Sequence, residues 1–326
     1  MKLTGVVILI SSIGFYLNGS MELLTAIIMM IMSFIVFSGL ETMGAYSALL
    51  RVVDMCVERA KETLSIEPMD ISGEEYITKT DNIEISSVDF AYDKKKIIDN
   101  VSLIIPEKTT VAFVGPSGGG KTTLCHLIAR FWDVDKGMIS LDEKNVKDYS
   151  MDSLMQNFSF VFQNVYLFHD TIANNIRFGQ PNTPMDDVIM AAKKACCHDF
   201  IIALPDGYNT VIGENGASLS GGEKQRISIA RAIMKDAPII ILDEATANVD
   251  PENERDLMEA IQELTKEKTV LMIAHRLKTV RKAEQIFVIN KGKIEQHGTH
   301  DELIMQDGIY QRFVDSRREA IGWKIG

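Results

Sequence analysis

The sequence feature that most constrains the fold is a glycine-rich loop between an apolar strand and a helix. The run Val111-Ala112-Phe113-Val114 predicts a buried strand, which leads directly into Gly115-Pro116-Ser117-Gly118-Gly119-Gly120-Lys121-Thr122. This loop matches the pattern G-x-x-x-x-G-K-[ST], and residues 122–131 predict the helix that follows. In such a loop the glycines let backbone N–H groups converge on phosphate oxygens, and the helix N-terminus adds partial positive charge. The pattern therefore predicts an α/β fold that binds a nucleoside triphosphate.

Individual residues of the loop have separate expected roles. Lys121 is placed to reach the β and γ phosphates, and the Thr122 hydroxyl to bind Mg²⁺. The residues that we expect to bind the nucleotide here are Gly115, Pro116, Ser117, Gly118, Gly119, Gly120, Lys121, Thr122 and Thr123.

Two adjacent carboxylates follow a second apolar strand. Pro238 precedes the run Ile239–Leu242, and proline is tolerated at the first residue of a strand. A fully apolar strand belongs inside a parallel sheet, and its carboxyl end lies at the edge where α/β sheets bind ligands. Asp243 and Glu244 therefore come to the same edge as the loop. We expect one of them to hold the water shell of the metal and the other to polarise the attacking water.

Charge is distributed unevenly along the chain. The net charge of −11 over 326 residues argues against nucleic acid as a partner, because phosphate backbones require a clustered basic surface. Residues 23–40 are 18 residues without a charge, near the length needed to cross about 30 Å of hydrocarbon. Beyond them, apolar residues keep helical spacing until Pro68 ends the pattern.

The N-terminal segment, residues 3–17, is also apolar and has two possible interpretations. It has the composition of a signal peptide, but no small-x-small cleavage site follows it, and Asn18-Gly19-Ser20 fits a tight hairpin. We therefore expect two membrane-spanning helices at about 3–17 and 21–66, with both ends on the cytoplasmic side. Lys2 and Arg51 agree with the positive-inside trend. This divides the chain into a partial transmembrane domain, 1–68, and an ATP-binding domain, 69–326.

The cysteines and histidines of the sequence do not predict a metal site. The four cysteines show neither a C-x-x-C motif nor a disulfide-like spacing, so reduced thiols are expected. Adjacent residues on a helix point about 100° apart, which argues against a ligand set in Cys196-Cys197-His198-Asp199. His297 and His300 lie in a polar stretch with Gly298, which favours a surface turn.

A third motif, Leu219-Ser220-Gly221-Gly222-Glu223, lies between the phosphate loop and the carboxylates. With Gln163 before it and Asp250 and His275 after it, the order of motifs over about residues 80–315 resembles the ATP-binding-cassette (ABC) family. The resemblance implies a P-loop NTPase fold with a parallel-sheet core, an antiparallel β subdomain and a helical signature subdomain. It also implies that the nucleotide is ATP. In the family, the signature motif completes the ATP site of a facing second chain, and the matching residues here are Ser220, Gly221, Gly222 and Glu223.

The resemblance carries further roles onto matching positions. Tyr92 matches the aromatic residue that stacks on adenine, Glu244 the catalytic base, and His275 the switch histidine at the γ-phosphate. Gln163 matches the glutamine that joins the metal site to the transmembrane part, so the implied Mg²⁺ set is Thr122, Gln163 and Asp243. Asp250 ends a loop that runs along the dimer seam in the family, where Asn248 departs from the common sequence.

The resemblance also implies a class of transporter. Residues 210–216 resemble a loop specific to exporters, which points to a multi-pass half-transporter of the cell membrane with its cassette in the cytoplasm. Six transmembrane helices are usual, and only the last two are resembled here, which leaves a truncated product, a fragment or a false start at Met1. The expected partners are a second half-transporter chain, identical or not, the lipid bilayer and an unknown substrate. The alternatives are a nucleotide-gated dimerisation module without transport, and a soluble family member acting in DNA repair or translation.

Overall fold

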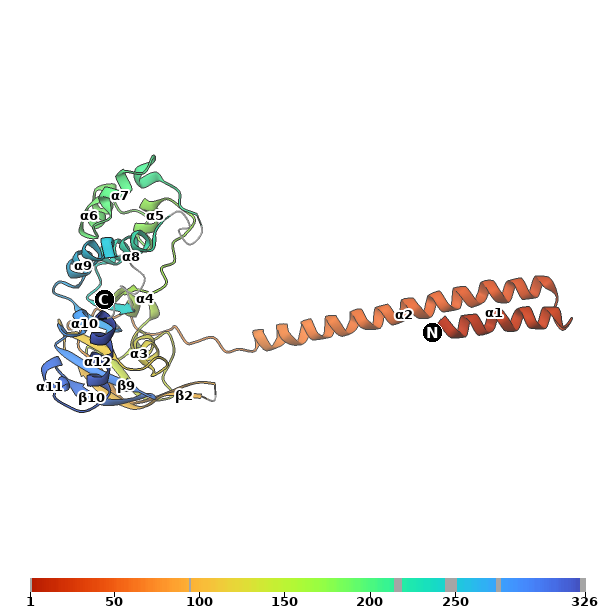
Figure 1. Cartoon of the computed structure of the whole chain (residues 1–326), viewed down its shortest axis with the longest axis horizontal. Coiled ribbons are helices and arrows are strands. Elements are labelled where there is room, and N and C mark those ends of the chain that lie inside the picture. Colours follow the sequence, from red (N-terminus) through yellow and green to blue (C-terminus); the bar gives the residue numbers. More distant parts are fainter. Residues whose placement is uncertain (1, 94, 214–218, 244–250, 274–276, 323–326) are drawn as a thin grey trace. The chain divides into compact units, whose positions relative to one another are not determined.

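The computed structural model describes residues 2–93, 95–213, 219–243, 251–273 and 277–322. It divides into two compact units, Met1–Pro68 and Met69–Gly326, which Figure 1 shows as a helical hairpin and an α/β body. Three residues expected in the site, Glu244, Asp250 and His275, lie outside the described residues. So do residues 214–216 of the loop compared with exporters.

The first unit consists of helix α1 (Lys2–Leu17) and helix α2 (Leu23–Leu64). The turn between them passes through Gly19, whose φ of 66° suits a residue without a side chain. Small side chains are buried along the hairpin, among them Ser12 and Ala26, whereas most of its large apolar side chains are exposed.

Membrane-spanning helices were expected in this unit. Among the described residues, the structure contains no helix that combines the length and the apolarity needed to cross a membrane. Helix α1, for instance, has 16 residues, fewer than the roughly 20 that a span requires. The expectation of two membrane-spanning helices is therefore not confirmed.

The second unit is built on a six-stranded sheet. Its strand order is β10-β9-β3-β8-β7-β6, and all neighbours are parallel except β10, which runs antiparallel to β9. The central strands are mostly apolar and almost entirely buried, as expected for parallel strands covered on both faces. The strands are β3 (Thr110–Val114), β6 (Phe158–Val161), β7 (Ile239–Asp243), β8 (Thr269–Ile273), β9 (Gln285–Asn290) and β10 (Lys293–Gly298).

A smaller antiparallel sheet packs beside it, with strand order β2-β1-β4-β5. Along β1 buried residues such as Ile83 and Ile85 alternate with exposed ones, because one face of this sheet meets the core. The strands are β1 (Ile83–Tyr92), β2 (Lys95–Ile105), β4 (Lys136–Leu141) and β5 (Lys144–Asn145).

Helices cover the sheets. Helices α5 to α7 gather at one end of this unit (Figure 1), and α8 links that end to the sheet by packing against β6. The helices are α3 (Lys121–Ile128), α4 (Met151–Gln156), α5 (Ile172–Ile176), α6 (Met185–Lys194), α7 (His198–Ile202), α8 (Gly221–Lys235), α9 (Pro251–Thr265), α10 (Leu277–Val280), α11 (His300–Ile304) and α12 (Ile309–Gly322). The described residues also include 3₁₀ turns at Val146–Asp148 and Gly207–Asn209.

Strand β3 supplies both hydrophobic cores of the unit through its alternating side chains. Ala112 and Val114 pack with the helical end, whereas Val111 and Phe113 pack with α3 and the antiparallel sheet. Helix α3 is therefore held between the two sheets, and Leu124, Leu127 and Ile128 are buried there. This packing fixes the start of α3 relative to the carboxyl end of β3, which positions the loop between them.

Candidate nucleotide-binding site

The phosphate loop follows β3 and ends where α3 begins. Gly115 has a φ of 138°, and a Cβ there would collide with the carbonyl oxygen of Ile289 on β9, so only glycine fits. Gly120 is the N-cap of α3 with a φ of 108°, again a conformation that favours glycine. Because the first N–H groups of a helix have no partner within it, the N–H groups of Lys121, Thr122 and Thr123 are oriented to bind an anion.

Lys121 is folded back over this loop. Its Nζ donates hydrogen bonds to the carbonyl oxygens of Gly115, at 3.0 Å, and Pro116, at 2.9 Å. The side chain is only 6% exposed, so the ammonium group is fixed at the loop with little conformational freedom left to lose on binding.

A pocket of about 250 Å³ opens over the loop. Residues 117–123 line it on one side and Lys95 and Ile97 of strand β2 on the other. A ring of backbone N–H groups, a helix N-terminus and two ammonium groups fits a polyphosphate chain, because each supplies positive charge or donors. The residues present therefore fit the nucleotide that the loop predicts.

Asp243 and Gln163 lie at the same edge of the sheet as the loop. Asp243 ends β7 and pairs in register with Ile273 of β8, which itself pairs with Phe113 of β3. Gln163 comes two residues after β6, the other neighbour of β7. The carboxylate of Asp243 is close enough to α3 that, after burial itself, it contributes to raising the pKa of the Cys125 thiol. One carboxylate, one amide and the Thr122 hydroxyl at this edge are oxygen donors of the kind that Mg²⁺ prefers.

An aromatic pair lies next to Lys95 of the pocket lining, because Tyr92 pairs with Lys95 in the β1–β2 ladder. Tyr92, the last residue of β1, is 37% exposed and packs edge-to-face against Trp132, with ring centroids 5.4 Å apart. Trp132 stacks in turn on His126 of α3, at 6.1 Å. Burial lowers the pKa of His126 below its usual value. The side chain expected to stack on a base thus rests on α3, the helix that also carries the phosphate loop.

The signature motif begins helix α8. Ser220 is its N-cap and forms a capping box with Glu223, in which the Ser220 N–H donates to Glu223 Oε2 at 2.8 Å. Ser220 and Gly221 are exposed, so the N-terminus of α8 is open to a ligand. Among the described residues that line the pocket over the phosphate loop, none belongs to 219–223. The loop and the signature motif of one chain are therefore not brought into one pocket.

The domain is identified by this arrangement together with one comparison. A family model described as ABC transporter matches residues 98–247, which run from β2 past the end of β7. This chain contains an ABC transporter domain. Nucleotide binding is a property of the matched domain, in agreement with the phosphate loop.

Relatives of this ABC chain are named as flippases. An ATP-dependent lipid A-core flippase of Syntrophus aciditrophicus is 47% identical over 249 residues, which cover 76% of this chain and 41% of the relative. The protein of the same name from Haemophilus influenzae is 43% identical over 273 residues, covering 83% and 45%. This ABC chain therefore spans less than half the length of these curated relatives.

A solved structure resembles nearly the whole ABC chain. It is described as a bacterial Atm1-family ABC exporter with ATP bound, with a TM-score of 0.74 and 31% sequence identity. The similarity covers 97% of this chain and 56% of that one. It therefore includes the hairpin as well as the cassette.

The structure adds ABC site residues that sequence reasoning missed. Lys95 and Ile97 line the pocket, Trp132 supports Tyr92, and Gln225 Nε2 donates to the carbonyl of Phe162 at 3.3 Å. The last contact ties α8, which begins at the signature motif, to the residue before Gln163. No local sequence pattern identifies these residues, because each contacts a residue that is distant in the sequence.

Proposed function

We propose that the second unit is the ATP-hydrolysing cassette of an exporter-type ABC transporter. The observation that carries the proposal is the common sheet edge, which holds the phosphate loop after β3, Asp243 at the end of β7 and Gln163 two residues after β6. This edge brings together groups that donate hydrogen bonds to phosphate and oxygen ligands for a metal ion. Phosphoryl transfer to water requires both. The names of the relatives and of the similar exporter structure support the same activity.

Under this proposal, separate residues bind the base, the phosphates and the metal ion. Tyr92 stacks on adenine, residues 115–123 hold the phosphates, and Lys121 neutralises charge on the β and γ groups. Thr122, Asp243 and Gln163 would hold Mg²⁺, which supplies further neutralisation of the phosphate charge. Glu244 accepts a proton from the attacking water, and His275 contacts the γ-phosphate. These last two assignments rest on the sequence motifs alone.

The partner that we propose is a second ABC cassette facing the first. In support, the exposed start of α8 carries Ser220 and Gly221 at a helix N-terminus, and it does not line the pocket of its own chain. Such an N-terminus attracts the γ-phosphate held by another subunit. Gly222, Glu223 and Asp250 would complete this contact across the dimer seam.

We further propose that the hairpin belongs to the membrane part of the transporter and that the cassette lies in the cytoplasm. Large apolar side chains on α1 and α2 are open to the surroundings, among them Leu24, 68% exposed, and Phe34, 66% exposed. Contact with lipid or with other helices would cover them. We propose a lipid of the lipopolysaccharide class as substrate, because the relatives are named for lipid A-core.

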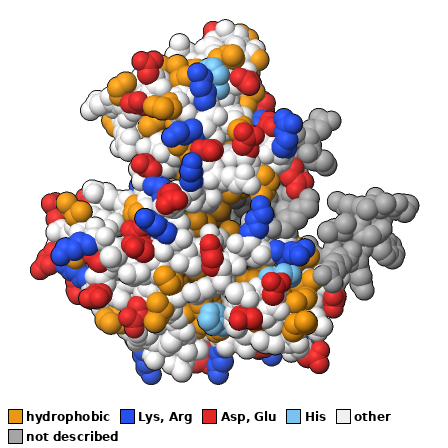
Figure 2. Space-filling view, turned by 90° about the vertical axis from the view of Figure 1, so that its left-hand side faces the viewer, with side chains coloured by type: hydrophobic (Ala, Val, Ile, Leu, Met, Phe, Trp, Pro, Cys, Tyr) orange, Lys and Arg blue, Asp and Glu red, His pale blue; other side chains and the backbone are white. Residues whose placement is uncertain are grey.

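The face drawn in Figure 2 carries mixed charge. Figure 2 shows Lys and Arg side chains interspersed with Asp and Glu on the face that it draws. A phosphate backbone binds instead to clustered basic residues.

Glu244→Gln tests the proposed hydrolysis. The amide keeps the shape of the side chain but cannot accept the proton, so ATP hydrolysis should fall by roughly 10²–10⁴-fold. Binding of ATP should be retained, and the chain should accumulate as an ATP-bound dimer in size-exclusion chromatography. The measurements are phosphate release and nucleotide binding on the full chain in mild detergent. Turnover near that of the wild type would refute the assignment of Glu244.

A further inference from the structure

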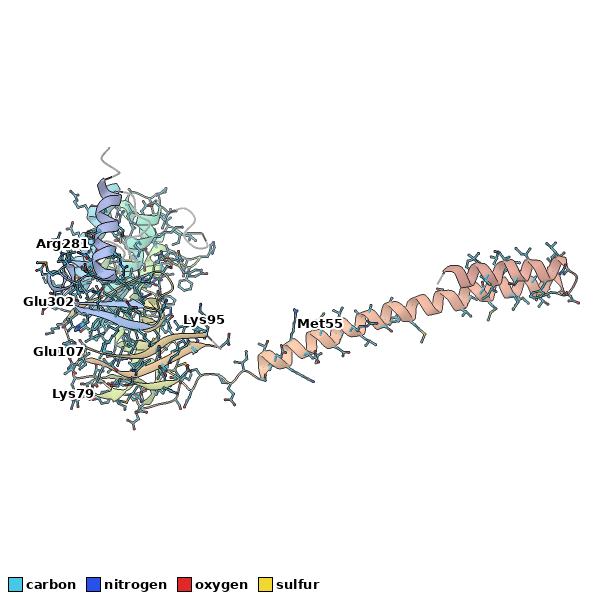
Figure 3. All side chains as sticks on the ribbon, turned by 60° about the horizontal axis from the view of Figure 1, so that its bottom comes forward. Met55, Lys79, Lys95, Glu107, Arg281 and Glu302 are labelled. Carbon is cyan, nitrogen blue, oxygen red and sulfur yellow. The ribbon has the colours of Figure 1, made fainter. Side chains whose placement is uncertain are left out.

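Strand β2 supplies an ammonium group to the nucleotide pocket that no motif accounts for. Lys95 is the first residue of β2 and lines the pocket together with Ile97, two residues further on and therefore on the same face of the strand. The strand lies close to the loop, since a Cβ at Gly120 would be 3.0 Å from the carbonyl oxygen of Ile97. Figure 3 shows Lys95 at the tip of the ribbon formed by β1 and β2.

Lys95 differs from the next residue in its ionic contacts. Lys96 is bound to Asp89, with Nζ 3.0 Å from Oδ1, and to Asp99 as well. Those two carboxylates hold the Lys96 ammonium group, and they raise its pKa through their hydrogen bonds. By contrast, the exposed Lys95 side chain forms no ion pair with any of the residues that the structure describes. One lysine of the strand is thus structural and the other is available to a ligand.

The position of Lys95 indicates the part of the nucleotide that it meets. In the β1–β2 ladder Lys95 pairs with Tyr92, the residue proposed to stack on the base. It also lines the same pocket as Lys121, which serves the β and γ phosphates. A cation between the base end and the terminal phosphates faces the α and β phosphates.

We infer that Lys95 binds the α and β phosphates of the nucleotide and strengthens the binding of both ATP and ADP to this chain. The inference rests on the proposed nucleotide-binding function. Because ADP and ATP share these two phosphates, Lys95 should contribute equally to both. It should not affect the chemical step, because the γ-phosphate is held by other groups.

The test is calorimetric titration of the full chain with ADP and with a non-hydrolysable ATP analogue. Lys95→Met should raise both dissociation constants by the same factor, roughly 1.4- to five-fold, which is the range of an exposed charge pair. Lys95→Arg should restore the wild-type values, since it keeps the charge. Lys96→Met is the matched control, with the same charge removed one residue away, and should leave both constants unchanged.

Ionic strength separates a charge contact from a structural effect. Near 0.5 M salt the screening length falls to about 4 Å, so the difference between wild type and Lys95→Met should disappear. Equal affinities of the two proteins at low salt, a difference that persists at high salt, or failure of Lys95→Arg to restore binding would each overturn the inference. If the wild type itself binds neither nucleotide, the proposed function fails first and the inference with it.

Discussion

At the proposed stacking position of the base, two aromatic residues far apart in the sequence form one support. Tyr92 ends a strand of the antiparallel sheet, and Trp132 follows the helix of the phosphate loop. Their edge-to-face contact orients the Tyr92 ring by packing. A base stacked on Tyr92 would therefore be held relative to α3, and so relative to its own phosphates.

Tyr92→Ala is expected to weaken ATP binding and to leave the maximal rate largely intact. Stacking of a base on an aromatic ring contributes roughly 1–3 kcal/mol, and the reacting phosphate lies far from the base. Trp132→Ala should act in the same direction with a smaller effect, because it removes the support and not the stack. Steady-state kinetics give KM and kcat, with Tyr92→Phe as the control that keeps the ring. If Tyr92→Ala abolished turnover at saturating ATP, Tyr92 would be a structural residue.

Sequence reasoning at this scale succeeds where neighbours in the chain carry the chemistry. Residues 115–122 predict a loop between a strand and a helix because their glycines, lysine and threonine act together locally, and β3 and α3 flank the loop as expected. Lys95, Trp132 and Gln225 could not be recognised, because each has an ordinary local sequence. Their importance comes from strand register or from packing between elements.

The elements themselves show the same distinction between local and long-range causes. The proline before Ile239 correctly marks the start of β7. Residues 101–105 indicate only the end of β2, which runs from Lys95, because its first half is rich in charge. The helix expected up to residue 131 ends at Ile128, and Arg130 adopts a φ of 54°. Its guanidinium group there donates to the carbonyl oxygens of Asp70, at 2.7 Å, and Tyr149, at 3.2 Å.

The segment from 69 to 82 is another feature that the sequence did not predict. It has almost no regular secondary structure, and the Asp142 carboxylate is one of the groups that hold it against the rest of the unit. Asp142 accepts hydrogen bonds from the Lys79 N–H at 2.8 Å, the Thr80 hydroxyl at 2.7 Å and the Tyr76 hydroxyl at 3.0 Å. All three partners lie more than 60 residues away in the chain, so no local pattern contains them.

This arrangement predicts a pH dependence of stability. The hydrogen bond from the Lys79 N–H is the main cause that lowers the pKa of Asp142, opposed by partial burial and aided by Thr80 and Tyr76. A carboxyl group whose pKa is lower in the folded state stabilises the fold above its unfolded pKa, near 4, and that stabilisation is lost as pH falls through the folded value. Asp142→Asn should therefore reduce the free energy of unfolding by about 1 kcal/mol at pH 7 and by less below pH 4.

Urea unfolding followed by tryptophan fluorescence between pH 3 and pH 7 measures this difference. Glu143→Gln is the control, because it removes the adjacent carboxylate, which is exposed, and should change stability little. A constant difference between the wild type and Asp142→Asn across this pH range would contradict the assigned role of Asp142.

At the scale of the whole molecule, the phosphate loop and the signature motif of one chain belong to two different nucleotide sites, and each motif supplies half of its site. The loop pocket is built by residues of the antiparallel sheet and α3, whereas Ser220 begins α8 at the other core. Two such ABC chains facing head to tail would join each loop to the signature of the partner. The order of motifs along one chain predicts both the phosphate loop and the signature motif. Only the structure shows that the two motifs do not line one pocket.

Complementation between two damaged chains tests this head-to-tail dimer. Lys121→Ala damages the phosphate loop of its own chain, whereas Ser220→Arg places a bulky cation in the site that the chain lends to its partner. In a homodimer each variant alone should lose nearly all ATPase activity. In a mixed dimer both lesions fall on one site and leave the other intact. Mixing the two proteins should therefore restore part of the phosphate release, from the mixed fraction of dimers.

The recovery depends on whether one intact site can hydrolyse ATP while the other is inactive, and a second mixture measures that directly. Wild type mixed with Glu244→Gln gives dimers with one competent site, so their activity shows whether a single site suffices. When this control is active, recovered hydrolysis in the Lys121→Ala and Ser220→Arg mixture shows that the signature acts on the nucleotide of the facing chain. When it is active and the mixture stays silent, Ser220 does not act in trans, and the head-to-tail dimer is wrong.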